Sequence, residues 1–165
     1  MTKRVYETIT GRRIELSRLT SDERMFLRPV RKKYEARPGW SAFGSWWTGA
    51  LSRAGLTEKS VAYRICQDLE ARLGIAQGRV GAPDYRDYLA DLIEVRYGSR
   101  YRFCKEQGVD PGHLSRVLAS RSELSLESLK QVLGALGAVL TVQGEKEVRD
   151  HASPREASRA LAGVR

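Results

Sequence analysis

The most informative stretch of this chain is SRYRFCKEQGVDPGHLSRVLA, residues 99–119. Its pattern predicts two short helices, 100–107 and 111–119, joined by a tight turn at Gly108. Helices joined in this way cross closely, which requires a small side chain at the crossing, and Cys104 fills that place. We therefore expect a helix-turn-helix; the alternative is an ordinary helical hairpin.

Both predicted helices are preceded by residues that begin helices. Ser99 and Asp110 are typical N-caps, and Pro111 suits the first helical position because its missing N–H leaves nothing unpaired there. The second helix has apolar side chains at i, i+3 and i+4, which places them on one face. The side chains expected to point into the core are Val109, Leu114, Val117 and Leu118.

Helices are also predicted on both sides of this motif. Residues 83–98 form an amphipathic helix that has Pro83 in its first turn and ends at Gly98, with an apolar face of Tyr85, Tyr88, Leu89, Leu92 and Ile93. After a loop, Ser125 caps a further helix, whose apolar stripe is Leu126, Leu129, Val132, Leu133 and Leu136. Residues 138–142 then predict a short strand.

The N-terminal region begins with a strand and a basic helix. Ile14 and Leu16 alternate with polar residues, which predicts a short strand at a sheet edge. Thr20 or Ser21 can cap the helix that follows. Pro29 within that helix indicates a kink or a later start, because proline removes a helical hydrogen bond.

Two more helices and a linker follow. Residues 41–53 carry a stripe that favours a packed core over a nucleic-acid stacking platform: Phe43, Trp46, Trp47, Ala50 and Leu51. Thr57 caps the next helix and Gly74 ends it. These helices outline a second, weaker hairpin, against which Arg64 counts because it falls at an inward position. The glycine-rich segment 74–82 predicts a linker between two sub-domains.

Composition and charge indicate a protein that binds a polyanion. The chain has 165 residues, of which 41% are hydrophobic, but no apolar run long enough to span a bilayer and no signal-peptide core. Its net charge is +9, and residues 1–80 carry 16 basic against 8 acidic side chains, whereas residues 81–143 carry 8 of each. A cytoplasmic protein that binds nucleic acid is the first hypothesis from this balance.

Neither catalysis nor metal binding is predicted. Cys66 and Cys104 lie outside any CxxC pair, and with His113 and His151 they complete no zinc-binding spacing, so we interpret them as small buried thiols. A cysteine nucleophile needs a base within reach, yet Cys104 is expected inside and His113 outside. We therefore expect no enzyme activity, no cofactor and no metal ion.

Over about residues 84–143 the sequence resembles the lambda-repressor-like helix-turn-helix family, also called the XRE family. The resemblance rests on residues 99–108, on the Gly-Val-Asp turn, and on the stretches HLSRVL (113–118) and LESLKQVL (126–133). It implies a mainly α bundle whose second motif helix enters the major groove while the first crosses the phosphate backbone. It also implies a dimer on inverted half-sites.

The resemblance implies a set of DNA-contacting residues: Ser99, Arg100, Arg102, Pro111, Gly112, His113, Ser115, Arg116, Ser120 and Arg121. Arg116 suits a bidentate contact to guanine, although it could equally clamp a phosphate or a carboxylate. The chain departs from the family in Cys104, where Ala is usual, and in Pro111 and Gly112, which supply no donor where Gln or Ser is frequent. In the basic stretch 24–37, the residues Arg28, Arg31 and Lys32 are either further phosphate contacts or part of a solvated helix face.

The sequence thus predicts a mainly α protein in three parts. Residues 1–80 form a basic helical region with a short strand, residues 81–143 form the helix-turn-helix bundle ending in a short strand, and residues 144–165 form a polar tail that is loose or holds a short helix. The expected function is a sequence-specific transcriptional repressor that binds an inverted-repeat operator as a homodimer. One alternative is an antitoxin that binds a toxin through residues 1–80; another is a regulator of a phage or mobile element.

Overall fold

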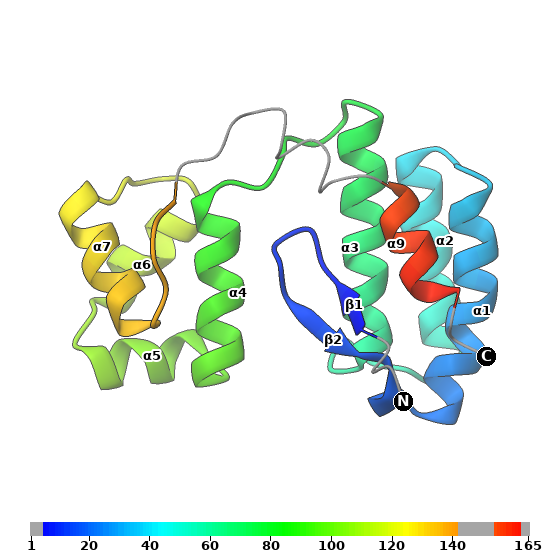
Figure 1. The fold of residues 1–165 in the computed structure, drawn as a ribbon, viewed down its shortest axis with the longest axis horizontal. Helices are drawn as coiled ribbons and strands as arrows, with labels where there is room; N and C mark the ends of the chain where they lie inside the picture. Colours follow the sequence, from blue (N-terminus) through cyan, green and yellow to red (C-terminus); the bar gives the residue numbers. More distant parts are fainter. Residues whose placement is uncertain (1–4, 142–153, 163–165) are drawn as a thin grey trace. The chain divides into compact units, whose positions relative to one another are not determined.

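The computed structural model describes residues 5–141 and 154–162, the side chains of 154–156 excepted. The fold is mainly α-helical, with a short two-stranded antiparallel sheet near the N-terminus (Figure 1). This confirms the predicted fold class. The chain forms two compact units: unit 1 comprises Met1–Ala82 together with Glu145–Arg165, and unit 2 comprises Pro83–Gly144.

Unit 1 combines a β-hairpin with four described helices. β1 (Val5–Glu7) and β2 (Arg13–Glu15) pair antiparallel, with Tyr6 opposite Ile14. The predicted strand therefore ends at Glu15, and Leu16 already lies in a 3-10 turn, η1 (Leu16–Arg18). The helices are α1 (Ser21–Glu35), α2 (Trp40–Arg53), α3 (Val61–Ala76) and α9 (Pro154–Leu161).

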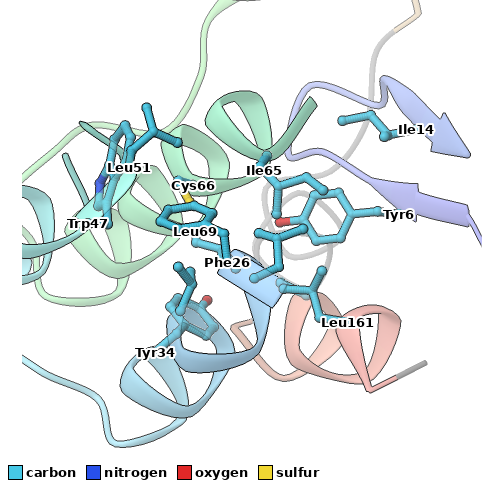
Figure 2. Packing of buried hydrophobic residues seen from close by; sticks show 14 of the residues in the cluster. Tyr6, Ile14, Phe26, Tyr34, Trp47, Leu51, Ile65, Cys66, Leu69 and Leu161 are labelled. Carbon is cyan, nitrogen blue, oxygen red and sulfur yellow. The ribbon is translucent and has the colours of Figure 1, made fainter. Parts of the chain in front are cut away.

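α3 is the central helix of unit 1. It packs against α1, α2 and α9, and the side chains buried around it come from both ends of the chain. Figure 2 shows this packing through Tyr6, Ile14, Phe26, Ile65, Cys66, Leu69 and Leu161. α3 packs against three other helices, and Gln67 and Ala76 are its only exposed residues. This argues against the second hairpin, over α2 and α3, as a further DNA-reading motif.

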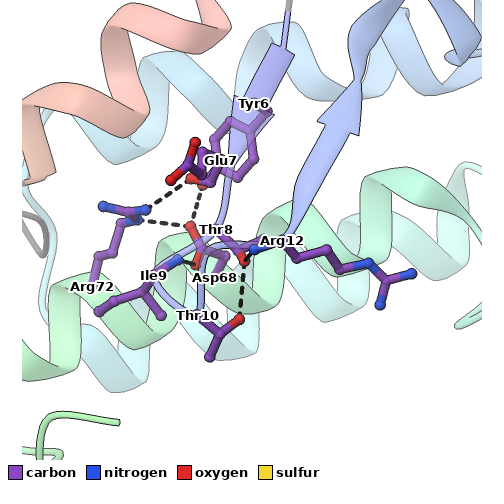
Figure 3. A network of polar contacts seen from close by, with 8 residues as sticks. All are labelled: Tyr6, Glu7, Thr8, Ile9, Thr10, Arg12, Asp68 and Arg72. Carbon is purple, nitrogen blue, oxygen red and sulfur yellow. Dashed lines mark hydrogen bonds and ion pairs between the residues drawn. The ribbon is translucent and has the colours of Figure 1, made fainter. Parts of the chain in front are cut away.

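A buried polar network fastens β1 to α3 (Figure 3). Asp68 accepts hydrogen bonds from the Tyr6 hydroxyl and from the Ile9 backbone N–H (2.6 Å). It also pairs with Arg72 one turn along α3 (2.7 Å), and Arg72 donates to the Glu7 carbonyl (2.9 Å). The buried carboxylate and guanidinium thus have partners from both the hairpin and the helix. The sequence did not predict this network, because the contacts between hairpin and α3 join residues 59 to 65 positions apart.

Glu23 of α1 stabilises the beginnings of two helices. It forms a capping box with Thr20, whose hydroxyl accepts from the Glu23 N–H (3.2 Å) while the Glu23 carboxylate accepts from the Thr20 N–H (2.9 Å). The other carboxylate oxygen accepts from the N–H groups of Val61 (2.7 Å) and Ala62 (3.3 Å) at the start of α3. Thr20 is therefore the N-cap, and α1 continues through Pro29 instead of starting later.

The predicted boundaries of α3 are wrong at both ends. Its N-cap is Ser60, while Thr57 takes part in the preceding turn by accepting a hydrogen bond from the Ser60 hydroxyl (2.7 Å). At the other end α3 continues past Gly74 to Ala76. Gly74 is needed there for packing, because a Cβ at this position would lie 2.6 Å from the Val80 side chain.

The expected polar tail is in part a component of unit 1. α9 buries Ala157 and Leu161 against β1, α1 and α3. The Leu161 carbonyl accepts a hydrogen bond from Arg31 (3.2 Å), and the Ser158 hydroxyl donates to Glu35 (2.8 Å). A helix of this length is marginal alone in water, so these tertiary contacts hold it in place.

Unit 2 is a bundle of four described helices. They are α4 (Tyr85–Tyr97), α5 (Arg100–Gln107), α6 (Pro111–Leu118) and α7 (Leu126–Ala135). Their apolar core consists of Leu89, Ile93, Phe103, Cys104, Leu114, Leu129, Val132, Leu133 and Leu136. Both cysteines of the chain are free and buried, which confirms their interpretation as small core thiols.

Several details of unit 2 differ from prediction. Tyr88, predicted on the apolar face of α4, is 40% exposed. Pro83 precedes α4, whose N-cap is Asp84. Leu126 begins α7 but is 57% exposed, so it lies off the apolar stripe. Residues 138–141 form no strand in the described chain, because unit 2 offers them no strand to pair with; Val142 lies outside the described residues.

Candidate nucleic-acid interface

α5 and α6 are joined by a three-residue turn, 108–110. Gly98 (φ +73°) and Gly108 (φ +65°) end α4 and α5 in the left-handed conformation that glycine adopts without strain. The side chains of Ser99 and Asp110 each accept a hydrogen bond from the backbone N–H three residues later, at the start of α5 and α6. These local contacts confirm the predicted starts of both helices.

α6 has a buried face and an exposed face. Leu114 and Val117 are 2% and 0% exposed and hold the helix on the core of unit 2. His113 is half-buried, so it is less open to a partner than the sequence predicted. The exposed residues of the helix and its end are Pro111, Gly112, Ser115, Arg116 and Ala119.

Arg116 reaches back toward the N-terminal end of α6. A Cβ at Gly112, one turn earlier, would lie 3.5 Å from Arg116 Nη1 and 3.4 Å from Asp110 Oδ1. Side chains in an α-helix tilt toward its N-terminus, so this is the direction expected of a long side chain at 116. The Arg116 guanidinium therefore places hydrogen-bond donors where Pro111 and Gly112 have none.

The loop after α6 is held by contacts to both α6 and α4. Ser120 has a left-handed φ of +57°, and the Arg121 N–H donates to the carbonyl five residues earlier (2.8 Å). Farther along, Glu123 pairs with the Arg86 guanidinium and accepts a hydrogen bond from the Tyr85 hydroxyl (3.2 Å). Ser120 and Arg121 are both exposed on this braced loop.

The first turn of α5 presents cationic and aromatic side chains to solvent. Arg100 and Arg102 are exposed, as is the N-cap Ser99. Arg102 pairs with Glu106 (2.6 Å), and this hydrogen bond raises the pKa of its guanidinium. The pairing offsets the charge of Arg102, so Arg100 is the stronger candidate for a phosphate. Tyr101 lies between them and is 71% exposed.

The three predicted phosphate contacts outside the motif lie on α1 of unit 1. Arg28 and Lys32 are exposed one turn apart. Arg31 is half-buried, donates to the Leu161 carbonyl (3.2 Å) and lies 3.6 Å from the Glu35 carboxylate. The structure thus brings Arg28 and Lys32 together at the surface, whereas Arg31 serves to hold α9.

The side chains that α5 and α6 expose suit the binding of a partner. Burial raises the pKa of the Cys104 thiol and the Asp110 carboxylate raises it further, so the thiol stays protonated at neutral pH. In the described ranges, no group of three or more His, Cys, Asp or Glu side chains could hold a metal ion, and no helix has the length and apolar character to cross a membrane. What α5 and α6 offer is an exposed set of hydrogen-bond donors and positive charges.

The residues that brace this surface were not predicted from any sequence pattern. Arg86 and Glu123 are 37 positions apart, and the Tyr97 hydroxyl joins α4 to the ends of α5 and α7 through two hydrogen bonds (3.0 and 3.1 Å). Long-range pairs of this kind leave no periodicity in a sequence. The exposure of Tyr101 could have been predicted from the sequence, because this residue falls outside the apolar spacing of α5.

Comparisons with known proteins yield no match to this chain, whether with family models, with curated proteins or with solved structures. The resemblance to the XRE family therefore stays a prediction. The functional proposal rests on the geometry of α5 and α6 and on the exposed side chains of Arg100, Arg116 and Arg121.

Proposed function

We propose that this chain is a sequence-specific DNA-binding transcriptional regulator, a repressor that inserts α6 into the major groove as a dimer. The observation that carries the proposal is the two-faced α6, which follows α5 across the turn at Gly108. Leu114 and Val117 hold one face on the core, and Ser115 and Arg116 stand exposed away from it. A helix held in this way has one side available for base edges.

The net charge and the exposed arginine and serine side chains support the same proposal. The chain carries a net charge of +9, most of it in residues 1–80. Within unit 2, Arg100 at the start of α5, Arg116 in α6 and Arg121 just after α6 are exposed. Arginine and serine side chains at such positions suit phosphate oxygens, which fix a protein in register on the duplex. A regulator of this kind acts on DNA in the cytoplasm and needs neither a cofactor nor a catalytic group.

The salt dependence of duplex binding tests the proposal. The full chain is titrated with a fluorescent pool of randomised duplexes at increasing salt. With on the order of 6–10 phosphates neutralised per dimer, affinity should fall roughly 10³–10⁵-fold between ~50 and ~200 mM salt, because bound counterions are released. A flat salt response would remove DNA as the partner.

The dimer is the second element of the proposal. A single recognition helix reads only a few base pairs, so twofold pairing is needed for a specific address. The operator should then be an inverted repeat whose half-sites lie about one helical turn apart. Light scattering that finds a monomer both free and on its DNA would contradict this element.

Unit 1 supports an additional role as an antitoxin. On the outer face of α1, Met25 is 62% exposed, and Arg28 and Lys32 follow it at i+3 and i+7. An apolar anchor beside two cations suits an acidic protein partner. Affinity purification of the full chain from its host should then recover one acidic protein in stoichiometric amount, and Met25→Asp should prevent the recovery. Recovery of none favours a regulator without a toxin, such as that of a phage.

A further inference from the structure

The N-terminal turn of α6 lacks the side chains that would read bases there. Pro111 and Gly112 have no hydrogen-bond donor in their side chains, and His113 is half-buried. The space over Gly112 is bounded instead by Arg116 Nη1, which lies 3.5 Å from the position that a Cβ would take. One long side chain from the next turn thus reaches the place that short side chains of the first turn leave open.

We infer that the small residue at position 112 sets the DNA specificity of α6, because the absence of a bulky side chain there leaves the space to the Arg116 guanidinium. The inference rests on the proposed DNA-binding function and specifies its target, a duplex with one guanine in each half-site. The two terminal nitrogens of Arg116 would donate to O6 and N7 of that guanine, the pairing that guanidinium geometry favours in the major groove. Gly112 acts through Arg116 and is a positioning residue.

The size of the side chain at 112 decides whether Arg116 keeps its place. The 3.5 Å and 3.4 Å distances from a Cβ at 112 to Arg116 and Asp110 are ordinary van der Waals contacts, so alanine fits without moving either neighbour. A leucine would extend from the same Cβ into the space of the guanidinium. Gly112→Ala and Gly112→Leu are therefore a matched pair in which the leucine variant alone displaces Arg116.

Selection from a randomised duplex pool tests the base preference. The full chain should enrich duplexes with one strongly preferred guanine in each half-site. Arg116→Ala and Gly112→Leu should both lose the preference at that one position, and Gly112→Ala should keep it. Arg121→Ala is the control for a phosphate contact: it should leave the preference unchanged and lower the salt slope by about one.

A double-mutant cycle distinguishes positioning from a direct clash with DNA. On the selected duplex, Arg116→Ala and Gly112→Leu should each weaken binding roughly ten- to hundredfold, with little change on a scrambled duplex. If Gly112 acts through Arg116, the double variant binds no more weakly than either single variant. Far-UV circular dichroism should be unchanged in all variants, because both positions are exposed on α6.

The outcomes of these experiments distinguish the role of Gly112 from the proposed DNA-binding function. Additive losses in the double variant would mean that the leucine side chain introduced by Gly112→Leu meets DNA by itself, which overturns the role of Gly112. An unchanged guanine preference in Gly112→Leu would overturn it as well, while duplex binding by the unaltered chain keeps the proposed function. No binding to any duplex at low salt would overturn both.

Discussion

Two ion pairs with the same sequence spacing differ between the units. Asp68 and Arg72 on α3 of unit 1 lie 2.7 Å apart, and Arg102 and Glu106 on α5 of unit 2 lie 2.6 Å apart. The side chains of Asp68 and Arg72 are 4% and 3% exposed, and those of Arg102 and Glu106 are 66% and 44% exposed. Breaking a buried pair leaves a charge without water, whereas an exposed pair is already screened. Spacing alone therefore does not tell what an ion pair contributes to stability.

The same contrast holds for the units as wholes. Glu23, Asp68 and Arg72 are the buried charged side chains of the described chain, and all three lie in unit 1, where they join β1, α1 and α3. Unit 2 packs an apolar core and leaves its described charged side chains at least partly exposed. We therefore expect unit 1 to depend on its polar contacts for folding, and unit 2 to use its charges for binding.

Asp68→Ala should have the largest effect on stability. It leaves the Arg72 guanidinium buried without its carboxylate, so unit 1 should lose about 3–5 kcal/mol. All three tryptophans of the chain lie in α2 of unit 1, so urea unfolding followed by tryptophan fluorescence measures this unit. Glu106→Ala, which breaks the exposed pair of unit 2, is the matched control. Amide hydrogen exchange in unit 2 should show that it costs less than about 1 kcal/mol. Equal losses of stability in the two variants would refute the distinction between the pairs.

Alkaline pH should weaken unit 1 by a smaller amount. Burial, followed by the nearby Glu70, raises the pKa of the Cys66 thiol, and burial also raises the pKa of the Tyr34 hydroxyl. For the Tyr6 hydroxyl, burial followed by the Asp68 carboxylate raises the pKa in the same way. Above their ordinary pKa values these groups lose protons in the unfolded chain but keep them in the folded unit, so stability falls as pH rises. From about pH 8 to about pH 10 we expect a loss of roughly 2–3 kcal/mol.

Two cysteine variants assign this alkaline loss. Cys66→Ala should remove the larger part of it, because a thiol titrates before a phenol. Cys104→Ala should leave the loss unchanged when tryptophan fluorescence is the signal, since Cys104 lies in unit 2. Urea transitions recorded at several pH values provide the measurement. A pH dependence that is the same with and without the Cys66 thiol would exclude this group as its source.

Capping boxes begin α1 in unit 1 and α4 in unit 2, and they differ in burial. Glu23 of α1 is 5% exposed and accepts hydrogen bonds from three backbone N–H groups, two of them on α3. Asp87 of α4 is exposed and accepts one, from Asp84 (2.9 Å). Glu23→Ala should therefore destabilise unit 1 by about 2 kcal/mol, and Asp87→Ala should destabilise unit 2 by about 0.5–1 kcal/mol. Fluorescence-detected urea unfolding reports the first, and amide hydrogen exchange in α4 reports the second.

The helices of the described part of unit 2 could be predicted closely, because the residues that begin and end each helix are neighbours in the sequence. Ser99, Asp110 and Ser125 cap the helices that the sequence assigned to them, and Gly98 and Gly108 end the helices before. A cap needs only the residues of one turn, and these are adjacent in the sequence. The exposed face of α6 followed from the spacing of its buried residues.

The features that were missed depend on residues far apart. Strand β1 was not predicted, and its position depends on Asp68, which lies 62 positions from Tyr6. The loop after α6 depends on Arg86 of α4, and the return of α9 to unit 1 depends on a contact with Arg31 across 130 positions. Such pairings are decided by packing, and a single sequence carries no periodic signal for them.

Removing a tyrosine hydroxyl should have the smallest effect on stability, and the change should be opposite in sign in the two units. The Tyr34 hydroxyl in unit 1 is buried with no hydrogen-bond partner among the described residues, whereas the Tyr97 hydroxyl in unit 2 donates to Ala135 (3.1 Å) and accepts from Gln107 (3.0 Å). Burying an unpaired hydroxyl costs free energy, and a paired one contributes about 1 kcal/mol. Tyr34→Phe should therefore stabilise unit 1 by up to about 1 kcal/mol, and Tyr97→Phe should destabilise unit 2 by about the same amount. Tryptophan-detected urea unfolding measures the first variant, and hydrogen exchange of the α4 and α7 amides measures the second. A loss of stability in Tyr34→Phe would mean that its hydroxyl is paired in solution.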